Sequence, residues 1–486
     1  MRSVRPVGAV LPVVAVLGAL AVPFGAGGAG GPGPADAVSA LLVLYCALRL
    51  ARARRRPLAP VAAVVLGLPV AGIALAAMGA GSPAAGFAGL GRYLQVFVLV
   101  PAAVVLLVRD RSGFRLVAWA FVGLALWQGA VGTHQYVTGT GASYQGAYVR
   151  AVGTFGPADV MGMASVVALG VVCAVGLALG GESGVRRRVA AAGCALVLLP
   201  PLALSFSRGA WIATAVACAA QLLLAGVRRA VRVGAAAVAA AVVLVGGFGV
   251  GSALLQERVG SITRVTDAPD QSVLDRYALW TAAVGIWRDH PLTGVGLKNF
   301  PEYRDAYAPL ALSAASDTEG AGAAFRRQPL LSPHNMYLLV LSEQGLAGLV
   351  ALAGSWLALL VCGLRRVRAS AFRHRCGPGG GLDCALVACG LLVWQLTDFG
   401  YGDIGGPSTV LTAVSLGLAA CWALAGGGVP ETDAPEADAL EAGVPQADAL
   451  VAGVPEADVP LDRTGGRAEG RAVGRAGGRG EGVLTR

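Results

Sequence analysis

Long apolar runs, separated by short polar segments, extend over most of the chain. Many of the runs approach the roughly 20 residues that an α-helix needs to cross the hydrocarbon core of a bilayer. Twelve runs fit this description, at residues 6–24, 35–50, 57–78, 89–108, 114–133, 158–180, 189–205, 209–227, 233–252, 346–363, 382–399 and 407–425. The pattern predicts an all-α fold, a polytopic membrane helix bundle with about twelve transmembrane helices within residues 1–425.

The arginines distinguish the two sides of this predicted bundle. They cluster between alternate pairs of runs, at 2–5, 49–56, 109–115, 186–188, 228–232 and 365–375, whereas the loops at 25–34, 79–88 and 400–406 contain none. Because basic residues accumulate in cytoplasmic loops, both termini are expected in the cytoplasm. A cleaved signal peptide is the alternative for residues 1–30, since Arg2 and Arg5 precede an apolar stretch that ends in small residues.

The composition agrees with a membrane protein and argues against two other classes of protein, cytosolic enzymes and nucleic-acid-binding proteins. Hydrophobic residues make up 56% and charged residues 14% of the chain. Soluble domains carry about 25% charged residues, so the composition argues against a cytosolic enzyme. The net charge of +10 would suit a nucleic-acid partner, but the arginines sit in short blocks between apolar runs, and nucleic-acid binding is therefore not expected.

Three segments are too polar to span a bilayer. Residues 134–157 and 253–333 lie on the predicted outer side, and the second segment is about 80 residues long. Long loops of this kind are commonly functional, so part of a site is expected within 253–333. Residues 426–486 join acidic, proline-containing sequence to Gly/Arg-rich sequence. Such sequence cannot bury a core, which predicts a disordered cytoplasmic tail.

Two arginines occur at the outer ends of predicted helices. Arg208 lies in the turn at 205–211, between the seventh and eighth runs, where an arginine must snorkel, pair or bind an anion. Arg276 shares one face of a predicted helix over 272–289 with Trp280. A cation beside an indole suits a phosphorylated sugar or a lipid headgroup, although an interfacial aromatic belt explains the tryptophan equally well.

Further polar residues accompany these arginines on the predicted outer side. His334 and Asn335 begin an apolar helix, and Glu343 follows two to three turns later. A histidine at the membrane surface can act as a base or a hydrogen-bond donor near neutral pH, but it can also cap the helix or face lipid. Arg150 adds a cation in a loop with flexible glycines. The sequence has no metal-binding or nucleotide-binding motif, so no metal ion and no cofactor are expected.

Taken in order along the chain, these motifs resemble those of the O-antigen ligase/polymerase family. The matching residues are Ser207-Arg208-Gly209-Ala210-Trp211, Arg276 with Trp280, His290-Pro291-Leu292-x-Gly294-Val295-Gly296-x-x-Asn299-Phe300, and His334-Asn335 with Leu341-x-Glu343-x-Gly345. Gly153-Thr154-Phe155 is similar to a Gly-Thr-Phe loop of the family, whereas Pro157-Ala158-Asp159 departs from its usual Pro-Asn ending. The resemblance covers roughly residues 90–425.

The resemblance implies a metal-independent membrane glycosyltransferase of the C-type architecture. Such an enzyme transfers a glycan from an undecaprenyl-pyrophosphate carrier to an acceptor hydroxyl on the outer face, and a flippase or a chain-length regulator would be its partner. By this similarity Arg208 and Arg276 would hold the pyrophosphate, and His334 would be the essential histidine. Arg150, Trp280, Asn335 and Glu343 are expected to support substrate binding.

The chemistry of the residues agrees with this activity, and alternatives remain. Arginine stays protonated and can stabilise a departing pyrophosphate, while His334 would orient or deprotonate the acceptor hydroxyl, with inversion at the sugar. The sequence does not separate a ligase from a polymerase. A membrane transporter or a lipid-linked-glycan flippase is the alternative, but a transporter should carry polar residues within its spans, and the runs consist almost uniformly of Ala, Val, Leu and Gly.

Overall fold

The computed structural model describes most of the chain up to Leu424. The described residues are 6–23, 33–53, 58–144, 149–180, 184–242, 271–309, 312, 318–321, 326–327, 330–376, 380–406 and 408–424. The tail predicted to be disordered (426–486) and the first part of the long outer segment (253–270) lie outside the described residues.

Each of the twelve apolar runs overlaps with one helix or with a set of consecutive helices. In chain order these are α1 (Pro6–Ala19), α2 (Pro34–Ala53), α3 (Pro60–Met78), α4 (Pro83–Leu94) with η1 (Gln95–Leu99) and α5 (Val100–Leu107), α6 (Arg111–Thr138), α7 (Gly162–Leu179), α8 (Val185–Val197) with α9 (Leu199–Leu204), α10 (Arg208–Ala225), α11 (Val227–Val242), α15 (Met336–Cys376), α16 (Leu382–Asp398) and α17 (Thr409–Leu424). The π-helical turn η1 precedes Pro101, and α9 begins beside Pro200.

The helical fold confirms the all-α membrane bundle expected from the sequence. Eight helices of the described chain are long and apolar enough to cross a membrane, and two shorter apolar helices accompany them, Gly8–Ala19 and Thr409–Leu424. The number of twelve spans stays a prediction, since α11 and α16 are in neither group.

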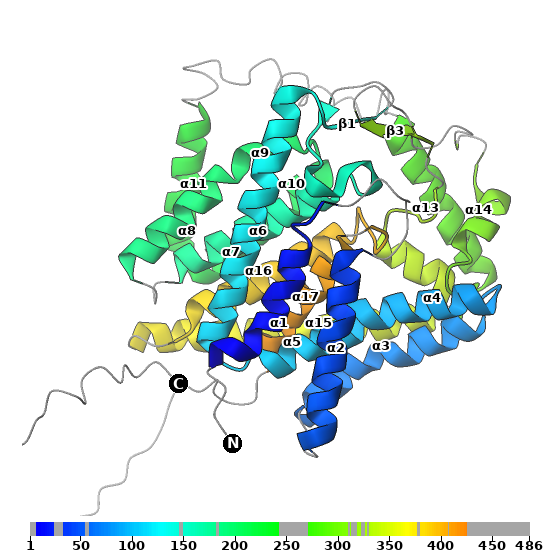
Figure 1. Ribbon diagram of the computed structural model, residues 1–486, viewed down its shortest axis with the longest axis horizontal. Coiled ribbons are helices and arrows are strands. Elements are labelled where there is room, and N and C mark those ends of the chain that lie inside the picture. Colours follow the sequence, from blue (N-terminus) through cyan, green and yellow to red (C-terminus); the bar gives the residue numbers. More distant parts are fainter. Residues whose placement is uncertain are drawn as a thin grey trace, which may run out of the picture. The chain divides into compact units, whose positions relative to one another are not determined.

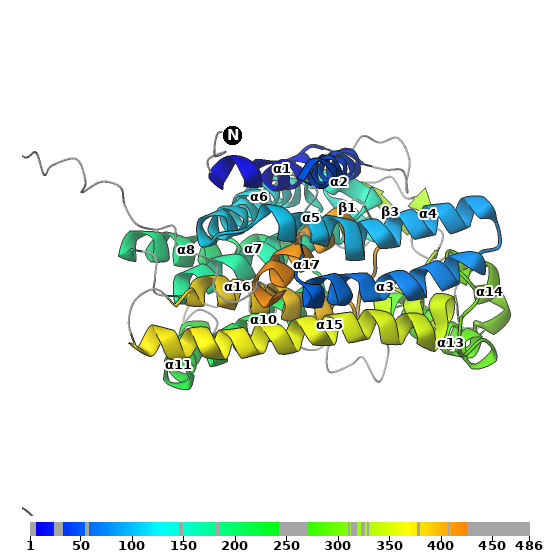
Figure 2. The same cartoon turned by 90° about the horizontal axis from the view of Figure 1, so that it is seen from below.

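One end of the bundle carries two further helices. α15 runs beside α3 and α16, while α7 packs between α6, α10 and α16. Figure 2 shows α3, α4 and α15 extending along the bundle, with α13 (Gln271–Asp289) and α14 (Phe300–Tyr307) gathered at one end. These two helices belong to the long polar segment, and α13 ends two residues before Pro291, as the sequence predicts.

A small sheet joins the two polar segments that were predicted to share one side. Its strand order is β2-β1-β3-β4, with β1 (Ala142–Tyr144), β2 (Val149–Arg150), β3 (Thr318–Ala321) and β4 (Arg326–Arg327), all antiparallel (Figure 1). Ala142 pairs with Arg150 on one side and with Ala321 on the other. The pairing requires both segments to lie at the same end of the bundle.

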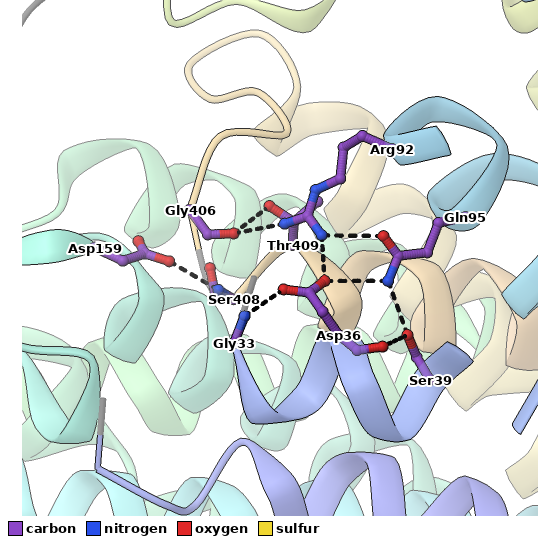
Figure 3. A network of polar contacts seen from close by, with 9 residues as sticks. All are labelled: Gly33, Asp36, Ser39, Arg92, Gln95, Asp159, Gly406, Ser408 and Thr409. Carbon is purple, nitrogen blue, oxygen red and sulfur yellow. Dashed lines mark hydrogen bonds and ion pairs between the residues drawn. The ribbon is translucent and has the colours of Figure 1, made fainter. Parts of the chain in front are cut away.

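Charged and polar side chains also lie between the helices, at the ends of apolar runs that adjoin the loops at 25–34, 79–88 and 400–406. Arg92 of α4 forms an ion pair with Asp36 of α2 and donates to the carbonyl oxygen of Gly406 at 3.0 Å. Gln95 donates to Asp36 at 3.1 Å and to Ser39 at 2.8 Å. Figure 3 shows Arg92 between Asp36 and the segment that precedes α17. Each charge is compensated inside the bundle, as burial requires.

Candidate functional site

Arg208 is the first residue of α10 and follows a constrained turn. Phe206 has a left-handed backbone with φ of 51°, which is uncommon for a non-glycine residue. Ser207 caps α10 by accepting a hydrogen bond from the N–H of Ala210 at 3.3 Å. The indole of Trp211 donates to the carbonyl oxygen of Leu202 at 2.8 Å. These bonds join α9 to α10 and fix the position of the backbone at Arg208.

Arg276 lies on α13, which packs against α14 and α15. Its charge acts electrostatically on the carboxylate of Asp398, the last residue of α16. One helical turn after Arg276, the indole N–H of Trp280 donates to the carbonyl oxygen of Pro333 at 2.9 Å. Tyr277 packs edge-on against Trp280, with ring centroids 5.6 Å apart. α13 therefore contacts the residue that precedes His334.

His334 occupies a strained turn immediately before α15. Its φ is 48°, in the left-handed region. Asn335 caps α15, because its Oδ1 accepts from the N–H of Leu338 at 3.1 Å, and its Nδ2 donates to the carbonyl oxygen of Gly400 at 3.1 Å. The N–H of Met336 lies 2.9 Å from the carbonyl oxygen of Phe399 and 3.0 Å from that of Gly402. We call residues 332–336 the His334 turn.

A loop that the sequence did not single out connects the three segments. Residues 398–403, here the 398–403 loop, carry Asp398, on which the charge of Arg276 acts, and the carbonyl groups that accept from the His334 turn. A β-carbon added at Gly209 would lie 3.0 Å from the β-carbon of Tyr401, so the Arg208 turn also packs against this loop. Ser332 donates a hydrogen bond to Asp403. The structure thus brings the segments of Arg208, Arg276 and His334 together.

Arg150 joins the same region through the backbone. It ends β2, and the N–H of the next residue, Ala151, donates to the carbonyl oxygen of Leu204 at 3.2 Å, just before the Arg208 turn. The Gly-Thr-Phe loop that follows is held by two amides of α6. Gln135 accepts from the N–H of Gly153 at 2.9 Å, and Gln128 accepts from that of Thr154 at 2.9 Å.

The motif at 290–300 and the motif at 341–345 meet at a break in α15. Gly345 has φ of 64° and ψ of −164°, which interrupts the helix. The carbonyl oxygens of Ser342 and Glu343 accept instead from Val295 and Gly296, at 3.0 and 2.9 Å. In return, Leu346 and Ala347 donate to Pro291 and Leu292, at 2.9 and 3.1 Å. The loop after α13 therefore replaces the hydrogen bonds that the helix loses.

Glu343 lies beneath this loop and not at its surface. Its side chain is 2% exposed, and Oε1 accepts from the N–H of Phe300 at 3.4 Å. Lys298, which has a left-handed φ of 66°, adds its positive charge nearby. Glu343 thus stabilises the segment at 298–300, which agrees with a supporting role more than with direct contact to a substrate.

Aromatic side chains pack together next to the His334 turn. Phe399 lies 5.0 Å from Trp356 and 6.4 Å from Tyr337, measured between ring centroids. Tyr337 also donates to the carbonyl oxygen of Leu396 at 2.6 Å. Among the residues that the structure describes, no group of three or more His, Cys, Asp or Glu is arranged to hold a metal ion.

Comparison with known families gives one assignment. Residues 193–353 match the family model for O-antigen ligase. The matched segment contains Arg208, Arg276, Trp280, His334, Asn335 and Glu343, whereas Arg150 and the 398–403 loop lie outside it. No curated protein matches the chain. The match over residues 193–353 confirms the resemblance to the O-antigen ligase family, within a multi-pass membrane protein.

Proposed function

We propose that the protein is a membrane glycosyltransferase that moves a glycan from an undecaprenyl-pyrophosphate carrier to an acceptor hydroxyl on the outer face, in the assembly of a surface polysaccharide. The match to the O-antigen ligase family supports a ligase-like, glycan-transferring activity. The single observation that carries the proposal is the meeting of the Arg208, Arg276 and His334 segments around the 398–403 loop.

Two fixed cations suit the departure of a pyrophosphate. The guanidinium group stays protonated and can donate two parallel hydrogen bonds to phosphate oxygens. Arg208 adds its charge to the positive end of the α10 dipole, since it is the first residue of that helix. In this mechanism, Arg208 and Arg276 stabilise the negative charge that grows on the leaving group, which is commonly the largest electrostatic contribution to catalysis.

His334 supplies the proton acceptor in this mechanism. The acceptor hydroxyl oxygen forms a bond to the anomeric carbon while its proton passes to the imidazole of His334. The bond from the anomeric carbon to the pyrophosphate oxygen breaks, and its electron pair leaves with undecaprenyl pyrophosphate. Attack opposite the leaving group inverts the configuration at the sugar. Arg150 contributes a further cation beside the Arg208 turn.

The activity can be tested with purified protein, a lipid-pyrophosphate-linked glycan and candidate acceptors, in buffer with a metal chelator. Mass spectrometry of the product identifies transfer. Replacing Arg208, Arg276 or His334 by Ala, one at a time, should abolish transfer while the protein remains in the membrane. Arg229→Ala is a matched control, because Arg229 donates to the carbonyl oxygen of Leu179 at the far end of α7. Full activity of all three variants would contradict the proposal.

A transporter is the second candidate, and one observation favours it. Transporters commonly bind substrate at broken helices, and the break of α15 lies beside the buried Glu343 and Gln344. The two functions predict different outcomes in proteoliposomes. A transporter accumulates a radiolabelled substrate, whereas a transferase consumes a lipid-linked donor without accumulation.

A further inference from the structure

The backbone of His334 is held in an unfavourable conformation by its surroundings. Among the described residues, Phe206, Lys298 and His334 are the non-glycine residues with positive φ. A left-handed conformation costs free energy for such a residue, and it persists only where neighbouring contacts impose it. The residues on either side of His334 show which contacts these are.

The contact before His334 comes from Trp280. Its indole N–H donates to the carbonyl oxygen of Pro333 at 2.9 Å. An indole has one polar hydrogen and no acceptor, so this bond occupies the whole hydrogen-bonding capacity of Trp280. Because Trp280 lies one turn after Arg276 on α13, the same bond links the helix of Arg276 to the His334 turn.

The contacts after His334 come from Asn335 and Met336. Asn335 uses Oδ1 to cap α15 and Nδ2 to bind the carbonyl oxygen of Gly400. The N–H of Met336 lies within hydrogen-bonding distance of two carbonyl oxygens of the 398–403 loop. The peptide units on both sides of His334 are therefore attached to separate elements, α13 and the 398–403 loop.

We propose that Trp280 and Asn335 are positioning residues, which act on the reaction through His334 and do not bind the donor directly. This inference rests on the proposed glycosyl transfer. Trp280 determines the separation of Arg276 and His334, and Asn335 determines the orientation of His334 relative to α15. Misplacement of a catalytic group by about 1 Å can lower a rate on the order of 100-fold.

The test removes the two hydrogen bonds. Replacement of Trp280 by 3-benzothienylalanine exchanges the N–H for sulfur with little change in volume, and Trp280→Phe is a genetic counterpart that also shortens the side chain. Asn335→Asp keeps the oxygen that caps α15 and loses the donor to Gly400. Trp127→Phe is the matched control. Trp127 lies on α6, and its indole N–H donates a similar hydrogen bond to the carbonyl oxygen of Ala21 at 3.1 Å.

Three measurements separate positioning from donor binding. We expect kcat to fall about tenfold or more in the Trp280 and Asn335 variants, while the Kd for undecaprenyl pyrophosphate stays within about twofold of the wild-type value. Hydrogen exchange of a peptide covering 332–338 should accelerate in the same variants. Trp127→Phe should change none of the three.

The outcomes are distinguishable from a failure of the proposed function. A wild-type protein that neither transfers glycan nor binds undecaprenyl pyrophosphate would overturn the glycosyltransferase proposal, and the exchange measurement would still report on the turn. A weaker Kd with unchanged kcat would show that Trp280 or Asn335 contacts the donor. Unchanged kcat and unchanged exchange in the benzothienylalanine variant would also overturn the positioning role.

Discussion

The backbone N–H of Leu346 donates a hydrogen bond of 2.9 Å to the carbonyl oxygen of Pro291, more than fifty residues earlier in the chain. In an uninterrupted helix this N–H would donate to Ser342, whose carbonyl oxygen instead accepts from Val295. The exchange explains how a helix can break inside the bundle without leaving backbone groups unsatisfied, which would be costly away from water.

Gly345→Ala should destabilise the protein strongly. The residue has φ of 64°, and a β-carbon there would lie 2.4 Å from the carbonyl carbon of Leu292. Backbone strain of this kind costs about 1–3 kcal/mol, and the clash adds to it. Thermal unfolding in detergent should show a lower midpoint. Gly67→Ala is the control, since nothing lies within 4 Å of a β-carbon at that position in α3; an equal loss of stability there would contradict the explanation.

Asp383→Ala should lower stability by about 3–5 kcal/mol, because it leaves a charge without its buried partner. The carboxylate of Asp383 is fully buried and binds Arg115 with two hydrogen bonds, of 2.7 and 3.2 Å. The pair of Arg304 with Asp305, whose side chain is 74% exposed, provides the comparison. Asp305→Ala should leave the unfolding midpoint nearly unchanged, since exposed ion pairs contribute little. Similar effects of the two substitutions would show that the first pair is not buried in solution.

Arg92→Leu should be more harmful than the double substitution Asp36→Leu with Arg92→Leu. The single change leaves the carboxylate of Asp36 without its guanidinium partner (Figure 3), whereas the double change removes both charges. A double-mutant cycle on unfolding midpoints measures the difference. Strict additivity of the two single changes would show that the ion pair does not contribute to stability.

The stability of the segment before α7 should depend on pH through Asp159. Asp159 precedes the span that begins at Gly162, and its burial raises the pKa of the carboxyl group above the usual value, although it accepts from the N–H of Ser408 at 2.9 Å. The folded state therefore binds this proton more tightly than the unfolded state does, and stability declines as the pH rises from the unfolded pKa to the raised folded pKa.

Comparison of wild type with Asp159→Asn measures this contribution. The unfolding midpoint of the wild type, followed as a function of pH, should fall across that interval, and the variant should lack this part of the decline. An identical pH dependence in both proteins would indicate that Asp159 titrates normally.

The sequence predicts the helices well because the bilayer imposes a local requirement. A helix that crosses hydrocarbon needs a continuous apolar run, and its backbone must be satisfied within the helix. The end of α13 at Asp289 also has a local cause, because Pro291 two residues later cannot continue the helix. The run predicted at 346–363 begins directly after the break at Gly345, so even this interruption left a boundary in the pattern.

The segments of the candidate site were also recognisable, since their residue types are unusual beside apolar runs. Arg208, Arg276 and His334 could each be singled out from the local sequence. Asp36 and Arg92 carried the same kind of indication and were passed over, because the runs around them are so strongly apolar. Gln128 was likewise hidden within the run at 114–133, and Gln135 lies just beyond that run, although both hold the Gly-Thr-Phe loop.

The sequence alone therefore determined the helical membrane fold and the unusual polar residues at the ends of apolar runs, because both are visible within a few turns of chain. Only the tertiary structure shows that the 398–403 loop lies against the His334 turn and Gly209, and that the charge of Arg276 acts on Asp398 of this loop. The tertiary structure also shows that the loop after α13 forms the backbone hydrogen bonds that α15 lacks at Gly345. Both arrangements consist of backbone hydrogen bonds and close packing between distant segments, and because such contacts use groups that every residue carries, the local sequence does not show which segments meet.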